Sequence, residues 1–322
     1  MTMTTTSVAE CGYYWSASLI DKDHASCLYF SNGKMQLFTE TDVILESFLS
    51  NDFVSNGHAV RLISLVGEKN AVGKSNSIAG NSSSCDKPDA FSVSENKKVC
   101  FAKGNLQYQA STDTWRFAEH QWDFIGDDNK NISWCYSGWI DFFGWGTGYD
   151  PTLTSKSCKD YSFFADWGLN DISNGGGKVW FTLTKEEWEY VFYTRKTSSG
   201  IRYAKAKIND VNGLVLLPDK WSSSYYSLNN TNQTEASFSD NTISQDDWTN
   251  KLEVNGAVFL PAAGDREGPK INYVGSSGYY WSMSGYTTCL SYYVWFGDSS
   301  MGKYRDDRDE GHSVRLVCSA EE

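Results

Sequence analysis

Hydrophobic and polar residues alternate with the period of a β-strand from residue 90 onward. Two alternating runs, Phe91–Ser94 and Val99–Tyr108, are joined by the polar turn Glu95–Lys98, which predicts a pair of antiparallel strands. Further along, Gly213–Pro218 and Ala257–Gly264 are short, continuous apolar runs of the kind that fit central strands. Strand signals therefore dominate this part of the chain.

One helix is predicted, from Thr184 to about Arg195. Thr184 is followed three residues later by Glu187, which is the spacing of a capping box. Apolar residues then recur at helical spacing and form a face for burial: Trp188, Val191 and Phe192. Short strands accompanied by a single clear helix predict the α+β class.

Long segments without periodicity separate these elements. Trp115–Trp167 is rich in aromatic residues and glycine, most densely at Gly138–Pro151, and Ser222–Asp247 is polar. Loops of this length in a compact domain are either functional or firmly packed. The many Trp and Phe residues favour packing for the first segment, whereas the second is expected to be a loop excursion.

A framework of three sequence blocks occurs twice in the chain. The C-terminal copy consists of GYYWSMS from Gly278, YYVWF from Tyr292 and GHSVRLV from Gly311. The N-terminal copy consists of GYYWSAS from Gly12, CLYF from Cys27 and GHAVRLI from Gly57. The first two blocks align without a gap, and an insertion around Thr39–Ser50 separates the last two blocks of the N-terminal copy. The blocks match between the two copies, whereas the sequences between the blocks do not. This pattern is typical of a scaffold that presents variable loops.

A change of composition between the two copies predicts the domain organisation. Residues 67–89 are dominated by Gly, Ser and Asn and have lost apolar periodicity, which indicates a linker. We therefore assign residues 1–66 to an N-terminal segment with a partial copy of the framework, and residues 90–322 to the main domain. The N-terminal segment is either a partial duplicate that packs against the main domain or a second binding module.

Alternation within the YYVWF block predicts which side chains are buried. Val294 and Phe296 are apolar at positions that are also apolar in the N-terminal copy, so we expect them to point inward. Tyr293 and Trp295 then face outward. Together with two nearby tyrosines, Tyr286 and Tyr304, these rings form a candidate binding hot spot. The alternative is that a loop or the N-terminal segment covers them.

Four motifs, in order, resemble those of a known fold. They are WFTLTKEEWEYVFYTR (Trp180–Arg195), FLPAAGDR (Phe259–Arg266), YYWSMS from Tyr279 and SVRLV from Ser313. The chain from Phe91 to Cys318 thus resembles the formylglycine-generating-enzyme (sulfatase-modifying) branch of the C-type-lectin fold. The resemblance implies a C-type-lectin-like α+β fold with short antiparallel strands, few helices and long aromatic and glycine-rich loops.

Within that branch, the chain resembles the variable proteins of diversity-generating retroelements, found in phages and gut Bacteroidetes. In that family a reverse-transcriptase system substitutes adenine-derived positions, so that loops vary while a Y-W-S…V-R-L-V framework stays fixed. The resemblance implies a non-catalytic protein that displays a diversified surface to a receptor or ligand. The alternative is a structural surface, appendage or virion subunit that uses the same aromatic face for assembly.

The resemblance places the variable region at about residues 285–310. This stretch is rich in Gly, Tyr, Thr, Ser and Asp, which mutagenised AAC codons can encode and which also resemble an antibody paratope. An ordinary polar surface loop is the alternative. Residues that AAC cannot yield belong to the scaffold or to other codons: Trp295, Met301, Lys303 and Glu310. The predicted ligand-binding residues are Tyr286, Thr287, Thr288, Ser291, Tyr293, Trp295, Gly297, Asp298, Tyr304, Asp306, Asp307 and Asp309.

The charge balance excludes one class of partner. A net charge of -12 and a pI near 4.8 repel phosphate backbones, so nucleic acid is not an expected partner. No apolar run approaches the ~18 residues of a membrane span, and the first residues, MTMTTTSVAE, lack the regions of a secretory signal. We expect a protein or glycan ligand on a host or neighbouring cell surface, and a location on a virion or cell surface.

No catalytic site is predicted. The eight cysteines include no CxxC pair, which argues against zinc and leaves both disulfides and a reduced state open. Formylglycine-generating enzymes use a thiol pair with copper, whereas Cys289 is the sole cysteine between Ala263 and Val317, so oxidase chemistry is not expected. The four histidines include no close pair, and His312 is expected to have a structural role.

The acidic stretch near the C-terminus is the remaining candidate for a metal site. Its carboxylates can supply oxygen ligands to calcium: Asp306, Asp307, Asp309 and Glu310. The spacing lacks the pattern of an EF-hand loop, and Arg305 and Arg308 lie among the acids and neutralise part of the charge. We favour a solvated, salt-bridged loop, with calcium as the alternative, and predict no metal or cofactor.

Overall fold

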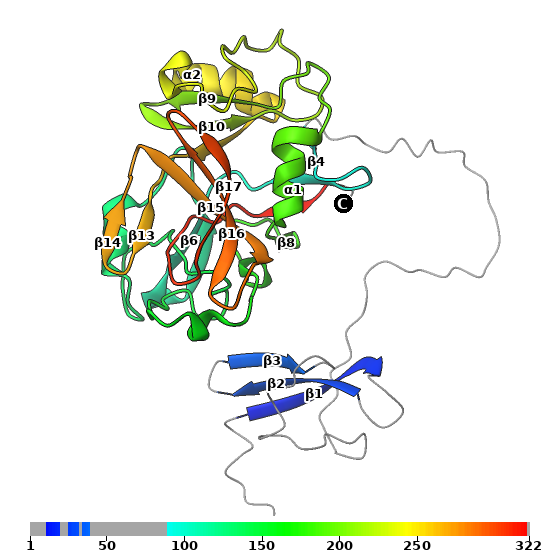
Figure 1. Cartoon of the computed structure of the whole chain (residues 1–322), viewed down its shortest axis with the longest axis vertical. Coiled ribbons are helices and arrows are strands. Elements are labelled where there is room, and N and C mark those ends of the chain that lie inside the picture. Colours follow the sequence, from blue (N-terminus) through cyan, green and yellow to red (C-terminus); the bar gives the residue numbers. More distant parts are fainter. Residues whose placement is uncertain (1–10, 20–24, 32–33, 39–88, 321–322) are drawn as a thin grey trace, which may run out of the picture. The chain divides into compact units, whose positions relative to one another are not determined.

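The computed structural model describes residues 11–19, 25–31, 34–38 and 89–320, and the chain divides into two units, Met1–Asn81 and Ser82–Glu322. Each unit is described by itself (Figure 1). The predicted linker, residues 67–89, lies outside the described residues apart from Asp89. Among the described residues, no helix has the length and apolar character needed to cross a membrane.

The larger unit combines several small sheets with few helices, in agreement with the α+β class. One four-stranded sheet has the order β4-β5-β18-β8, formed by Phe91–Ser92, Lys98–Phe101, Val317–Ser319 and Trp180–Phe181. The last strand, β18, therefore lies between β5 and β8. This pairing joins the beginning and the end of the unit, so that the GHSVRLV block runs into the centre of a sheet.

A second four-stranded sheet has the order β11-β9-β10-β12, formed by Thr242–Ile243, Tyr203–Ile208, Val211–Leu216 and Val258–Pro261. The two apolar runs predicted as central strands become β10 and β12. The prediction is correct for β10, which has a neighbour on each side. It is wrong for β12, an edge strand whose four residues are nevertheless all buried.

Within the described residues, two hairpins lie outside the framework and outside the two four-stranded sheets. They are β6–β7 (Leu106–Gln109 and Thr114–Phe117) and β13–β14 (Asp265–Glu267 and Lys270–Asn272). The run predicted as one strand, Val99–Tyr108, is divided between β5 and β6. Gly104 lies at the division, where a Cβ atom would approach the carbonyl oxygen of Ala118 to 2.4 Å. The chain leaves one sheet there and enters the next hairpin.

The predicted helix is confirmed and consists of α1 (Lys185–Glu189) followed by the π-helical turn η6 (Tyr190–Thr194). Both bonds of the capping box are present: the Glu187 amide donates to the Thr184 hydroxyl, and the Thr184 amide donates to the Glu187 carboxylate. Trp188 is buried, as are Val191 and Phe192. The helix packs against β15 and β16 (Figure 1).

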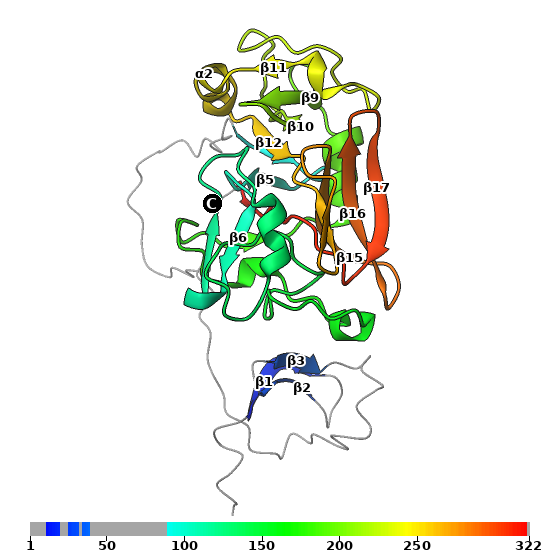
Figure 2. The same ribbon diagram turned by 90° about the vertical axis from the view of Figure 1, so that its left-hand side faces the viewer.

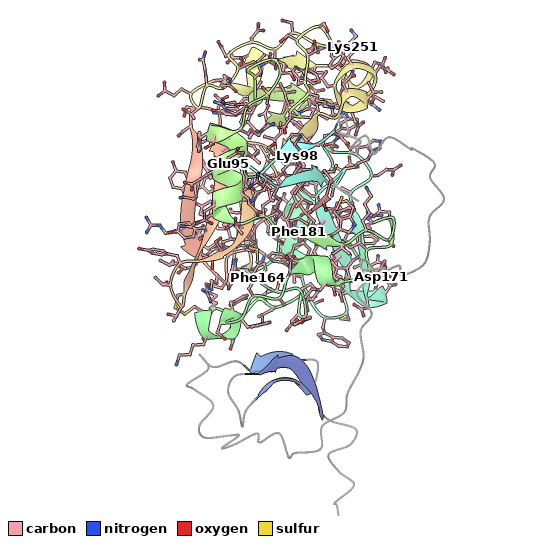
Figure 3. All side chains as sticks on the ribbon, turned by 90° about the vertical axis from the view of Figure 1, so that its right-hand side faces the viewer. Glu95, Lys98, Phe164, Asp171, Phe181 and Lys251 are labelled. Atoms are coloured by element: carbon pink, nitrogen blue, oxygen red, sulfur yellow. A yellow bond between two sulfur atoms is a disulfide. The ribbon has the colours of Figure 1, made fainter. Side chains whose placement is uncertain are left out.

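The remaining helical segments are short. They are η2 (Ala110–Thr112), η3 (Gly126–Asn131), η4 (Cys158–Tyr161), η5 (Trp167–Leu169), η7 (Phe238–Asp240), α2 (Gln245–Asp247), η8 (Trp248–Leu252) and η9 (Glu253–Asn255). The long aromatic segment is firmly packed, as predicted, since Trp115, Trp145 and Trp167 all belong to one buried cluster. Side chains fill the interior between the sheets (Figure 3).

The two framework copies fold into three-stranded sheets with the same strand register. The C-terminal sheet consists of β15 (Ser277–Gly285), β16 (Leu290–Gly297) and β17 (Met301–Asp307), seen side by side in Figure 2. The N-terminal sheet consists of β1 (Cys11–Leu19), β2 (Ala25–Ser31) and β3 (Lys34–Phe38).

Strand pairing extends the repeat beyond the blocks visible in the sequence. Trp15 pairs with Cys27 and Trp281 pairs with Tyr293, and an irregularity follows each Trp. The third strands also correspond, because Phe30 pairs with Met35 just as Phe296 pairs with Met301. The duplicated unit is therefore a whole three-stranded sheet.

A buried arginine connects this sheet to the rest of the domain. The Arg315 guanidinium donates to the side chain of Asn105 at 2.9–3.0 Å and to the carbonyls of Ala102 and Phe259 at 3.1 and 2.8 Å. The Asn105 amide donates to the Tyr280 hydroxyl of β15. Burial lowers the pKa of Arg315 to about 10, so the side chain stays protonated at neutral pH.

We expect Arg315→Met to lower the free energy of unfolding by on the order of 4 kcal/mol, because each buried oxygen left without a donor costs roughly 1–3 kcal/mol. Urea titration followed by circular dichroism measures this. Arg305→Met is the matched control at an exposed position of β17, with an expected loss below about 1 kcal/mol. Equal losses in the two variants would show that the Arg315 network does not stabilise the fold.

Candidate functional site

The two faces of the β15–β16–β17 sheet have different surroundings. On the inner face, four apolar side chains are buried in the main core: Tyr280, Val294, Phe296 and Met301. The opposite face, here called the aromatic face, carries the rings of Tyr279, Trp281, Tyr293, Trp295 and Tyr304. The predicted inward direction of Val294 and Phe296 is confirmed.

Hydrogen bonds fix the first strand of this sheet in place. The Trp281 indole donates to the Phe143 carbonyl at 2.7 Å, and the Trp145 indole donates to the Ser282 carbonyl at 3.0 Å. The Tyr280 hydroxyl donates to the Pro261 carbonyl at 2.9 Å. Because the long aromatic segment supplies two of these contacts, that segment positions the aromatic face.

The exposure of Tyr293 and Trp295 differs from the prediction. Both were expected to be exposed, and both are half-buried, because other rings cover them. Tyr293 stacks on Tyr279 at 5.8 Å between ring centroids, and Trp295 contacts Tyr304 edge to face at 5.7 Å. Tyr304 itself is 44% exposed. The aromatic face thus consists of interlocked rings with Tyr304 as its most accessible member.

Three predicted ligand-binding residues are either buried or held by contacts within the protein. Ser291 is completely buried, and its hydroxyl accepts a hydrogen bond from Arg308 at 3.0 Å, so its predicted surface position is wrong. Gly297 is buried at the end of β16. Asp298 follows it and accepts hydrogen bonds from Ser237 and from the amide of Phe238, which lower the pKa of its carboxyl group. Its contacts fix the start of η7.

Tyr286, Thr287 and Thr288 form the exposed turn between β15 and β16. The Thr287 hydroxyl accepts from the Leu290 amide at 3.0 Å, and its carbonyl accepts from Arg308 at 2.6 Å. A disulfide joins Cys289 of this turn to Cys158 of η4. The expectation that Cys289 has no partner thiol is therefore wrong. The turn is tethered at both ends and presents Tyr286 with half of its surface exposed.

Tyr292 is the centre of a cationic cluster that the sequence did not reveal. The charged ends of Lys185, Lys303 and Arg305 lie 4.5, 5.3 and 5.9 Å from its ring centroid. The alternation that correctly buries Val294 and Phe296 also predicts Tyr292 inward. It does lie on the inner face, but beyond the core, beside the first turn of α1. Lys185 and Lys303 are paired with Glu186 and Glu189 there.

β17 separates charge between the two faces. Lys303 and Arg305 alternate with Tyr304 and Asp306, so the cations lie on the inner face and the acid on the aromatic face. Asp306 is partly exposed, and Asp307, which is in register with the two cations, is exposed at the end of the strand. Asp309 follows in the loop and raises the pKa of Asp307, after the larger effect of desolvation.

The prediction of a salt-bridged acidic loop is wrong. Arg305 lies over the Tyr286 ring at 4.3 Å, and buried Arg308 donates to the carbonyls of Tyr161 and Thr287. Among the described residues, neither arginine forms an ion pair with an acid of this loop. Likewise, no group of three acidic, histidine or cysteine side chains within the described ranges is arranged to hold a metal ion.

The acids instead crowd together. Burial raises the pKa of Glu310 to about 8, with further contributions from Asp306, Asp309, Glu267 and Asp265. Asp265 is 8% exposed, and burial also raises its pKa. The cation among them is Arg266, which is buried and donates to the Gly268 carbonyl. Negative charge therefore exceeds positive charge at this end of the aromatic face.

His312 lies beneath the rings and beside the acids. It is fully buried, stacks on Trp281 at 4.1 Å and lies 4.7 Å from the Tyr293 ring. Its Nε2 is 3.4 Å from Asp306 Oδ2. Within the described part of the chain, neither ring nitrogen makes a hydrogen bond, and the same is true of Asp265 Oδ1. Other buried polar atoms nearby also lack a hydrogen bond within the described residues: Arg266 Nε and Nη2, Glu310 Oε2 and Ser313 Oγ.

Comparison with known proteins gives a partial match to a family model. A family model described as "Domain of unknown function (DUF8237)" matches residues 226–317, less than half of the chain. The match contains β15, β16 and β17 and ends with the GHSVRLV block. No curated protein and no solved structure matches the chain.

Glu310 generates a pH-dependent prediction. Its pKa is about 8 in the folded protein against an ordinary value of 4.5, so the folded state holds a proton that the unfolded state has released between these values. Stability therefore falls as pH rises through this window. We expect Glu310→Gln to lose less thermal stability than the unsubstituted protein between pH 5 and pH 8.

The measurement is a series of melting temperatures across this pH range. Glu95→Gln, at an exposed turn, is the matched control and should follow the unsubstituted protein. Identical pH profiles for Glu310→Gln and the unsubstituted protein would contradict the assignment of a proton to Glu310.

Proposed function

We propose that this protein is a non-catalytic binding protein that displays a diversified surface on a C-type-lectin scaffold, as its resemblance to retroelement-diversified variable proteins implies. The ligand is a protein or glycan on a host or neighbouring cell, and the protein is carried on a virion or cell surface. The surface consists of the aromatic face and the turn Tyr286–Thr288. Asp306 and Asp309 lie at its acidic end.

The observation that carries this proposal is the comparison of the two framework copies. In strand register, the buried positions Tyr280, Val294, Phe296 and Met301 correspond to Tyr14, Leu28, Phe30 and Met35. All four pairs keep a residue of similar bulk and polarity. On the aromatic face, Tyr293, Trp295 and Tyr304 correspond to Cys27, Tyr29 and Phe38. The two buried members of this face, Tyr279 and Trp281, are identical in the other copy (Tyr13 and Trp15), so identity changes only at its three more exposed positions. In the core, residues are kept or replaced by similar ones.

The chemistry of the outward positions also supports binding. Tyrosine and tryptophan supply large contact areas at a low entropic cost, and these residues are enriched in paratopes and interface hot spots. Tyr286 and Tyr304 are 49% and 44% exposed on a sheet held by buried hydrogen bonds. Exposed rings on a rigid support are pre-organised for contact, which reduces the entropic cost of ordering them on binding.

The proposal is tested by sequencing this locus from many genomes of one population. We expect substitutions at the codons of Tyr286, Thr287, Thr288, Tyr304 and Asp306, traceable to adenines of a nearby near-copy. The codons of the buried residues Ser291, Val294 and Phe296 should stay constant and serve as internal controls. If residues 285–310 vary no more than Phe91–Tyr108, diversification fails, and a structural subunit that assembles through the aromatic face becomes the better account.

A further inference from the structure

We propose that the acidic end of the aromatic face binds a cationic group, the ammonium of a lysine or the guanidinium of an arginine on a protein ligand. The site consists of the rings of Tyr293 and Tyr304 with the carboxylates of Asp265 and Asp306. This inference rests on the proposed binding function and specifies the chemistry of the group that is recognised.

The first element of the site is a continuous row of rings. Tyr273, 59% exposed, lies 6.1 Å from Tyr279, and Tyr279 lies 5.8 Å from Tyr293. Tyr293 lies 6.2 Å from Tyr304, which contacts Trp295. The faces of such rings carry negative potential and attract cations, most strongly where water is partly excluded.

The second element is an excess of negative charge beside these rings. Asp306 and Asp265 both raise the pKa of the Tyr293 hydroxyl, in addition to the larger effect of burial, so both carboxylates act on that ring. Glu267 and Asp309 add negative charge nearby, since both raise the pKa of Glu310, which at about 8 leaves Glu310 mostly protonated at neutral pH. A charged ligand group that forms a hydrogen bond with a carboxylate gains about twice the energy of a neutral one.

The cations of the protein are directed elsewhere. Lys303 and Arg305 lie on the inner face, and Arg308 is buried against Trp145. Arg266, the cation that faces the acids, is buried and donates to the Gly268 carbonyl. None of these, among the described residues, forms an ion pair with Asp265 or Asp306.

The third element is a pair of buried polar side chains with atoms that lack a hydrogen bond in the described part of the chain, both nitrogens of His312 and Oδ1 of Asp265. His312, 0% exposed, lies under Tyr293 with its Nε2 3.4 Å from Asp306 Oδ2, and neither ring nitrogen makes a hydrogen bond within the described residues. Asp265, 8% exposed, likewise has an oxygen without a donor there. Buried polar groups normally have partners. The ammonium or guanidinium of a ligand carries several N–H donors, so it can donate hydrogen bonds to the carboxylates of Asp265 and Asp306. His312 then lies beneath Asp306 and contacts its carboxylate from the protein side.

The site discriminates against other ligand classes. Phosphate, sulfate and carboxylate groups are repelled by its acids. A neutral glycan can stack on the same rings but does not relieve the repulsion among the carboxylates. Ring stacking alone would therefore allow neutral glycans to bind, whereas recognition through the carboxylates requires a cation, and the comparison of the two kinds of ligand distinguishes these modes.

The experiment measures binding of the full chain to immobilised peptides by biolayer interferometry. The probes are a peptide with several exposed lysines, its arginine counterpart, the fully acetylated lysine peptide and a panel of neutral glycans. We expect the lysine or arginine peptide to bind and the acetylated peptide to bind at least about fivefold more weakly.

Variants separate the site from the general attraction between an acidic protein and a basic peptide. Tyr304→Ala and Asp306→Asn should each weaken binding at least about fivefold, whereas Asp246→Asn removes the same charge from exposed α2 and should have no effect. Tyr304 is exposed, so its replacement keeps the fold, and circular dichroism checks this for every variant.

Three results would overturn the inference. If Asp246→Asn weakened peptide binding as much as Asp306→Asn did, the binding would be only the general attraction between an acidic protein and a basic peptide. A second result is binding of the acetylated peptide or of a neutral glycan, with this binding lost in Tyr304→Ala and kept in Asp306→Asn. That result would support the binding function of the aromatic face but reject a cationic ligand. Binding of neither peptide, in a chain whose locus varies at the outward codons, would likewise reject the cation and not the diversified surface.

Discussion

The hydrogen bonds of buried Arg315 are the constraint on which the rest of the domain depends. The guanidinium joins three segments that are remote in sequence: the chain after β5, the edge strand β12 and its own terminal segment. Through Asn105 it also reaches Tyr280 at the centre of β15. A planar guanidinium with several fixed donors suits this task, and lysine does not replace it.

This anchoring allows one sheet to serve two purposes. Its inner face is part of the core, where the loss of a few methylene groups typically costs 2–5 kcal/mol. On its aromatic face, Trp281 is buried and donates to the Phe143 carbonyl, whereas Tyr304 is exposed and contacts other rings of the face. A substitution at Tyr304 therefore costs little. A protein that must vary its surface without unfolding requires this separation, and strand alternation supplies it residue by residue.

Much of this arrangement follows from the sequence where the determinants are local. The capping box defined α1, the alternation of Val294 and Phe296 defined the inner face, and the repeated blocks pointed to a shared framework. The errors arose where distant segments meet. Ser291 is buried because Arg308 folds over it, and Cys289 has a partner because η4 packs against the turn. Val99–Tyr108 is divided because Gly104 meets Ala118, which strand periodicity cannot register.

The candidate site shows the same limit. Sequence composition indicated Tyr304 and Asp306, but the acids that surround them come from β13 as well as from the loop after β17, and His312 comes from the framework block itself. The cluster around Tyr292 depends on α1, which lies about a hundred residues earlier in the chain. Only tertiary contacts bring these groups together, so no local pattern predicts them.

The central claim is that the inner face fixes the fold, while the exposed and half-buried positions of the aromatic face and its turn are free to vary. Two libraries with the same randomised codons test it most directly by the fraction of protease-resistant members. One varies exposed or half-buried positions: Tyr286, Thr288, Trp295 and Tyr304. The other varies buried positions: Tyr280, Val294, Phe296 and Met301. The account predicts that most members of the first library fold and few of the second do. Equal losses in both libraries would contradict it.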